Sequence, residues 1–129
     1  MTDWRWVGNA AAIAIHLEQL AEHGGGEGVR DEGLLISALA RAQNAAAYGT
    51  PDAASLAAAY AYGIARNHPF IDGNKRTAWV VARLFLAKND FQIIFRKADA
   101  TVRMMALAAG EIDEEHFACW LRERFVEPD

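Results

Sequence analysis

Apolar side chains recur every three or four residues along most of the chain, which is the spacing that places them on one face of an α-helix. In the first such segment Ile13, Leu17 and Leu20 share a face. Asp99 is expected to cap the fifth segment, because aspartate accepts a hydrogen bond from the first turn of a helix. The pattern predicts six helices, over residues 10–23, 31–43, 53–67, 73–89, 99–110 and 113–124.

The breaks between these segments carry their own signals. Gly24–Gly26 end the first helix, and Pro69 pushes the residue before it out of helical geometry. The segment Gln43–Pro51 contains Tyr-Gly-Thr-Pro and is predicted to be a loop. Residues 91–95 are apolar and β-rich, which indicates an extended segment or one short strand. We therefore expect an all-α, single-domain bundle of about six helices without a sheet of three or more strands.

Composition narrows the classes of function. With 129 residues, the chain is expected to form one domain over residues 1–129. Its net charge of −4 disfavours direct nucleic-acid binding, which needs clustered Lys and Arg. The single cysteine, Cys119, lies in an apolar run and is expected to be buried and unreactive. Because one cysteine cannot form an internal disulfide, and because we find no signal peptide or membrane span, we expect a cytoplasmic location.

The chemistry concentrates in His68-Pro-Phe-Ile-Asp-Gly-Asn-Lys-Arg76, between the third and fourth helices. A helix N-terminus presents unpaired backbone N–H groups that attract anions. Gly73 lets the backbone adopt positive φ and approach a ligand, while Lys75 and Arg76 add two cations. These features together predict a phosphate-binding loop, anchored to the core by Phe70 and Ile71.

Asp72 and His68 extend this prediction to catalysis. A carboxylate beside phosphates is explained by a Mg²⁺ ion, which prefers oxygen ligands from one or two carboxylates plus phosphates. Histidine titrates near neutral pH, so His68 is suited to take a proton from an incoming hydroxyl. The alternative is an ordinary structural turn, since His-Pro and Asp-Gly-Asn sequences are common in loops.

This stretch resembles the Fic motif, His-x-Phe-x-Asp/Glu-Gly-Asn-Gly/Lys-Arg. Three further segments resemble the death-on-curing (Doc) branch of the Fic/Doc family: residues 28–35, 57–64 and 107–111. The resemblance implies an all-α core with the motif between two central helices. It also implies a toxin of a type II toxin–antitoxin system that modifies a protein substrate, with elongation factor Tu as the expected target.

The resemblance assigns a role to each site residue. His68 would be the general base, and Asp72 would hold Mg²⁺. Phe70 would be structural. The nucleotide, ATP, would be bound by the loop and by a basic residue two positions before the histidine, that is, by Gly73, Asn74, Lys75, Arg76 and Arg66.

Two positions depart from the pattern of AMP-transferring Fic enzymes. Those enzymes usually carry glycine where this chain has Lys75, and a second arginine where it has Trp79. A lysine would crowd the space that the α-phosphate occupies in AMP transfer. In Doc the lysine accompanies a reversed nucleotide, whose γ-phosphate faces the histidine. The resemblance therefore favours a kinase over an adenylyltransferase, with a catalytically silent binding module as a third alternative.

The absence of one sequence pattern bears on regulation. Many Fic proteins carry an inhibitory helix with a Ser/Thr-x-x-x-Glu-Gly/Asn pattern, which this sequence lacks. The resemblance implies an antitoxin chain that supplies this helix to a groove on the bundle. The predicted loop at 43–51 is a candidate flap over the site. His16, His23 and His116 occur singly and are expected to be surface or helix-end residues.

Overall fold

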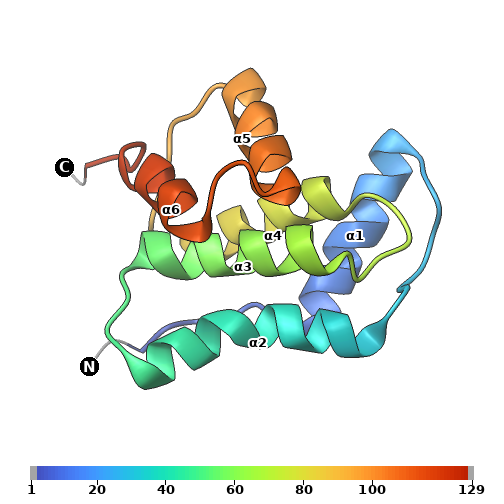
Figure 1. The fold of residues 1–129 in the computed structure, drawn as a ribbon, viewed down its shortest axis with the longest axis horizontal. Coiled ribbons are helices and arrows are strands. Elements are labelled where there is room, and N and C mark those ends of the chain that lie inside the picture. The colour runs from blue at the N-terminus through green and yellow to red at the C-terminus, as the bar shows by residue number, and fades with distance from the viewer. Residues whose placement is uncertain (1–2, 128–129) are drawn as a thin grey trace.

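The computed structural model describes residues 3–127 and confirms the all-α prediction. Figure 1 shows the helices packed around the central helix α3. Within the described residues there are two isolated β-bridges but no β-strand. The helices are α1 (Asn9–His23), α2 (Glu32–Tyr48), α3 (Ala53–Asn67), α4 (Asn74–Lys88), α5 (Lys97–Ala109) and α6 (Glu114–Arg122).

Helix α3 is the hub of the core and packs against α2, α4, α5 and α6. Most of its residues are buried, and many of them are alanines, whose small side chains let neighbouring helices approach closely. At Gly63 the backbones come very near each other, since a Cβ there would lie 2.8 Å from the Ala38 carbonyl oxygen of α2. Because α3 is fixed on several sides, its C-terminal end is a rigid support for the residues that follow.

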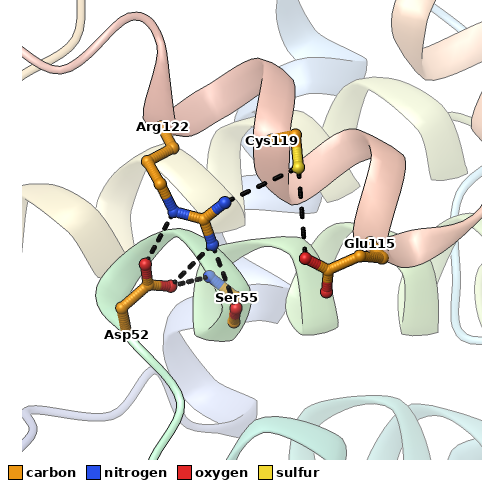
Figure 2. Close-up of polar contacts among 5 residues, drawn as sticks. All are labelled: Asp52, Ser55, Glu115, Cys119 and Arg122. Carbon is orange, nitrogen blue, oxygen red and sulfur yellow. Dashed lines mark hydrogen bonds and ion pairs between the residues drawn. The ribbon is translucent and has the colours of Figure 1, made fainter.

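Polar side chains fix the helix ends. Asp52 caps α3 by accepting from the Ser55 backbone N–H at 2.9 Å. The same carboxylate accepts two hydrogen bonds from Arg122 of α6, at 2.7 and 3.1 Å (Figure 2). These bonds lower the pKa of Asp52 to about 2. The contact joins the end of α6 to the start of α3. Cys119, beside Arg122 in Figure 2, is exposed, so its predicted burial is wrong.

The predicted loop at Gln43–Pro51 is wrong for residues 43–48 and correct for residues 49–51, which lie between α2 and α3. Helix α2 continues to Tyr48, because the alanine run at 45–47 favours helix and outweighs the turn signal of the residues after it. The end of α2 leads into the start of α3, whereas the motif follows the other end of α3 (Figure 1). The segment therefore cannot be a flap over the motif.

Two other local predictions can be compared with the structure. Residues 91–95 are extended, and Ile93 forms a single bridge with Phe125, as predicted. Helix α5 begins two residues earlier than expected, at Lys97, so Asp99 lies inside the first turn and Arg96 takes the cap position. None of the helices described in residues 3–127 has the length and apolar character needed to cross a membrane.

Candidate active site

His68 stands at the C-terminal end of α3 in a left-handed conformation, with φ 49° and ψ 55°. Its backbone N–H closes the last turn by donating to the Ile64 carbonyl at 3.2 Å. The left-handed region is costly for a residue with a Cβ, by roughly 1–2 kcal/mol. His68 is exposed while Pro69 and Phe70 after it are buried. The main chain is thus anchored at the next two residues, and the imidazole is left accessible.

Arg30 holds the His68 backbone from outside. Its guanidinium donates to the carbonyls of His68, at 2.8 Å, and Asn67, at 3.0 Å. Its backbone N–H donates to the Pro69 carbonyl at 2.7 Å. A cation at a helix C-terminus is favourable because the last carbonyls carry partial negative charge. Sequence reasoning did not assign a role to Arg30, and this contact between distant segments has no local sequence signal.

The glycine-rich segment after α1 packs directly on the motif. The Ile71 backbone N–H donates to the Gly28 carbonyl at 3.1 Å, and Val29 bridges to Phe70. A Cβ added at Gly25, whose φ is +123°, would lie 2.7 Å from an Asp72 carboxylate oxygen. The glycines that the sequence marked as a helix break therefore also serve close backbone approach to the motif.

The Asn74 side chain connects the start of α4 to the preceding loop through two hydrogen bonds to Phe70. Its side-chain oxygen accepts from the Phe70 N–H at 2.9 Å, and its amide nitrogen donates to the Phe70 carbonyl at 3.0 Å. Asn74 is 8% exposed and Phe70 is 1% exposed. The predicted anchoring role of Phe70 is confirmed, whereas that of Ile71 is wrong, since Ile71 is 58% exposed. Asn74 acts here as a latch on the loop, a role that the motif alone did not indicate.

The N-terminus of α4 faces outward with two cations beside it. Gly73 caps the helix at φ 75°, and no side chain among residues 3–127 accepts a capping hydrogen bond from its first turn. Lys75 and Arg76 are exposed in that turn. Asp72 lies next to them, and its Oδ1 accepts from the Gly73 N–H at 2.8 Å. This arrangement suits anion binding with a carboxylate at the edge of the site.

A cavity of about 670 Å³ continues from Lys75 and Arg76 along α4 toward α1 and α5. Apolar side chains and further cations share its lining. The half-buried Arg83 is among them; its Nε has no hydrogen-bond partner in residues 3–127, and desolvation lowers its pKa. The lining residues are Gln19, Glu22, His23, Lys75, Arg76, Trp79, Val80, Arg83, Phe95, Lys97, Ala100, Thr101, Met104 and Met105.

Comparison with known proteins identifies the family of the chain. The family model described as "Fic/DOC family" matches residues 6–86, which include the whole loop, all of α3 and α4 up to its last two residues. The chain is also 34% identical over 114 residues to "Protein kinase doc" of Escherichia phage P1, covering 88% of this chain and 90% of that protein. The chain belongs to the Fic/Doc family.

A second relative matches over a shorter stretch. The chain is 49% identical over 73 residues to "Toxin Doc" of Mycolicibacterium smegmatis, covering 54% of this chain. It spans 55% of that protein's length in this alignment.

Within this Fic/Doc domain, the residues from His68 to Arg76 form one continuous loop and helix start, whereas Arg66 contacts another element. Its guanidinium lies by the C-terminal end of α5, where Nη1 is 3.4 Å from the Ala108 carbonyl oxygen. A Cβ at Gly110 would lie 2.7 Å from the same nitrogen. The contacts described for Arg66 therefore link α3 to α5, and its role in nucleotide binding stays a prediction.

Trp79, at the position of the second Fic arginine, packs against Phe95, which precedes α5, and against α6. Its ring meets Phe95 edge-on at 5.0 Å between centroids and lies 5.8 Å from Trp120. Arg83 stacks over the same ring at 5.4 Å. The second arginine of the motif is thus replaced by a core aromatic residue, and the guanidinium that lies over it comes from one helical turn further along α4.

The prediction that His16 lies at the surface or a helix end is wrong. Its ring is 1% exposed and stacks on Phe70, with 4.0 Å between centroids and 14° between planes. Burial lowers the pKa of His16, while Asp72 and Glu27 oppose that shift. The sequence carried one weak signal, since residue 16 follows the buried Ala12 and Ile15 at helical spacing.

The donor set around Asp72 fits the predicted Mg²⁺. Across residues 3–127 there is no group of three or more His, Cys, Asp or Glu side chains that could hold a metal ion unaided. Mg²⁺ is bound in many nucleotide sites by one or two carboxylates together with phosphates and water. A single carboxylate beside an anion site therefore suits a metal that arrives with a nucleotide.

Proposed function

We propose that this Fic/Doc domain is a toxin that transfers the γ-phosphoryl group of ATP to a protein hydroxyl. The observation that carries the proposal is Lys75, which is exposed two positions after Gly73, at the N-terminus of α4. The names of the relatives, a toxin and a protein kinase, support the same function. The target expected from the resemblance is elongation factor Tu.

The chemical step uses groups at the two ends of the loop. The target hydroxyl oxygen attacks the γ-phosphorus, the bond from that phosphorus to the β–γ bridging oxygen breaks, and ADP leaves. His68, exposed at the end of α3, accepts the hydroxyl proton. The N–H groups of α4, together with Lys75 and Arg76, stabilise charge on the phosphates. Mg²⁺ bound through Asp72 would neutralise part of the phosphate charge.

The identity of residue 75 favours this product over AMP transfer. A lysine ammonium is a compact charge on a long stem, so it pairs with a phosphate only by occupying space near the loop. If that space is where an α-phosphate would lie, the nucleotide binds the other way round and presents its γ-phosphate to His68. Because positioning governs phosphoryl transfer, the orientation of the nucleotide decides the product.

ATP labelled separately on the α- and γ-phosphate tests this proposal. Incubation of the wild-type protein with elongation factor Tu and Mg²⁺ should transfer γ-label, and mass spectrometry should show a gain of one phosphate. Lys75→Gly should weaken that transfer and permit some α-label transfer, since the crowding side chain is gone. Transfer of α-label by the wild type would refute the kinase and support the adenylyltransferase.

The same experiment addresses the silent alternative. No transfer from either position, with elongation factor Tu present and ATP bound to the loop, would favour a binding module. The match with a protein kinase over 88% of this chain, together with the exposed His68, favours the enzyme.

We further propose that the cavity along α4 accepts the inhibitory helix of an antitoxin. An amphipathic helix with acidic side chains would suit this cavity, because its lining combines apolar side chains with four cations: Lys75, Arg76, Arg83 and Lys97. Arg83→Glu should then restore toxicity when the antitoxin is co-expressed, because the new carboxylate would repel the acidic side chains of the inhibitory helix and weaken its binding. Arg124→Glu is the matched control, since Arg124 also stacks on a tryptophan, at 4.5 Å from Trp120, but does not line the cavity.

A further inference from the structure

His16 is a buried polar side chain without a polar partner. Neither Nδ1 nor Nε2 has a hydrogen-bond partner among the described residues, and both atoms are shielded from solvent. The ring is held on one face by stacking on Phe70, so its volume is used in the core. A phenylalanine or leucine could fill this space without leaving two polar atoms unpaired, which is unfavourable in a protein interior. Packing against Phe70 explains the ring of His16 but not its two nitrogen atoms, whose role must lie in hydrogen bonding.

The polar edge of the ring faces the start of α4. Cε1, the carbon between the two nitrogens, lies 4.0 Å from the position of a Cβ built on Gly73. Asp72 contacts the same glycine, since its Oδ1 accepts from the Gly73 N–H. His16 and Asp72 thus both lie beside Gly73, the N-cap residue of α4.

In this structure the Asp72 carboxylate accepts a hydrogen bond from a backbone N–H that a bound anion would use. The Gly73 N–H is the first of the backbone donors at this end of α4, and the carboxylate now accepts its hydrogen bond. A bound phosphate would compete for that N–H and repel the carboxylate unless a cation lay between them. Asp72 must then turn toward the ligand and lose its present donor, and a carboxylate that ligates a metal is usually oriented by a second hydrogen bond.

We propose that His16 is a positioning residue for Asp72: when Mg²⁺ and ATP occupy the loop, a ring N–H of His16 donates to the Asp72 carboxylate. This rests on the proposed use of Mg²⁺ and ATP. An imidazole carries at least one N–H donor whether it is neutral or protonated, so the His16 ring can supply this hydrogen bond. The carboxylates that act on the ring are those of Asp72 and Glu27, and Arg76 Nη2 lies 4.0 Å from the same Cβ position at Gly73.

His16→Phe removes the donor and keeps an aromatic ring to stack on Phe70. Calorimetric titration should show binding of Mg²⁺–ATP weakened by roughly tenfold, the low end of the effect of outer-shell partners at metal sites. Binding of ATP without Mg²⁺ should be unchanged. His16→Gln, which keeps an N–H donor, should recover part of the loss. His116→Phe is the control, because His116 is exposed on α6 and far from the loop in sequence.

A double-mutant cycle separates positioning from packing. In an Asp72→Ala background, His16→Phe should cause no further loss of Mg²⁺–ATP binding, because the residue through which it acts is gone. Unchanged Mg²⁺–ATP binding in His16→Phe would overturn the proposal. So would a loss of the same size with and without Asp72.

NMR of the wild-type protein decides the matter if the variants do not fold. On addition of Mg²⁺–ATP, the imidazole ¹⁵N signals of His16 should shift together with the backbone amides of residues 73–76. Shifted amides with unchanged His16 signals would overturn the positioning role alone. Amides that do not respond to Mg²⁺–ATP would refute nucleotide binding at the loop, and with it both proposals.

Discussion

Replacing Asn74 with alanine tests whether the loop depends on an internal latch. The Asn74 side chain makes two hydrogen bonds to the backbone of Phe70, at 2.9 and 3.0 Å, in a part of the molecule that is closed to solvent. Alanine at this position supplies neither the acceptor nor the donor. The Phe70 N–H and carbonyl then remain buried without partners unless the loop opens to water.

The size of the effect follows from those two groups. A buried backbone group left without a partner costs about 1–3 kcal/mol, so two of them should lower the free energy of unfolding by about 3 kcal/mol. For 129 residues this corresponds to a fall in Tm of roughly 10 °C. Asn74→Asp should be at least as harmful, because its second oxygen would face the Phe70 carbonyl in place of a donor.

Urea denaturation followed by circular dichroism measures this difference directly. Asn44→Ala is the matched control: Asn44 also lies on a helix, α2, but is exposed, so its loss should change the free energy of unfolding by less than about 0.5 kcal/mol. Equal stability of Asn74→Ala and the wild type would refute the latch. It would also return Asn74 to the role that the motif suggested, direct contact with the nucleotide.

Three further perturbations test other parts of the structure. His68→Ala should lower phosphoryl transfer by about 10²–10⁴-fold while the urea midpoint stays unchanged, since its side chain is exposed; full toxicity of this variant in a growth assay would disprove the general base. Gly25→Ala should destabilise the protein by about 2 kcal/mol in thermal denaturation, because its Cβ meets Asp72 at positive φ. Gly8→Ala, where nothing lies within 4 Å of the added Cβ, should cost less than about 1 kcal/mol, and equal losses would contradict the close approach. Asp52→Asn should destabilise above pH 4 by less than about 1 kcal/mol, as its ion pair is partly exposed. Because folding lowers the pKa of Asp52 from 3.8 to about 2, its stabilising effect is present above pH 4 and disappears as the pH falls toward 2; a difference from wild type that persists at pH 2 would count against this assignment.

The sequence alone determined the helices and the position of the loop. Apolar spacing and punctuation by glycine and proline are local properties, and they predicted six helices whose ends agree with the structure within a few residues, apart from the end of α2. That exception has a local cause as well, since alanine propensity opposed the turn residues near Tyr48. The motif from His68 to Arg76 was recognisable because its members are adjacent in the chain.

Only the tertiary structure decided what holds and surrounds that loop. Arg30 reaches the carbonyls at the end of α3 across 38 residues, and His16 stacks under Phe70 from another helix. The turning of Arg66 toward Ala108 likewise depends on how α3 and α5 pack. These contacts join segments that are distant in sequence, and their energy comes from burial and hydrogen-bond geometry, which exist only once the helices are packed. Local spacing therefore indicated where the chemistry lies, while packing determined which side chains support it.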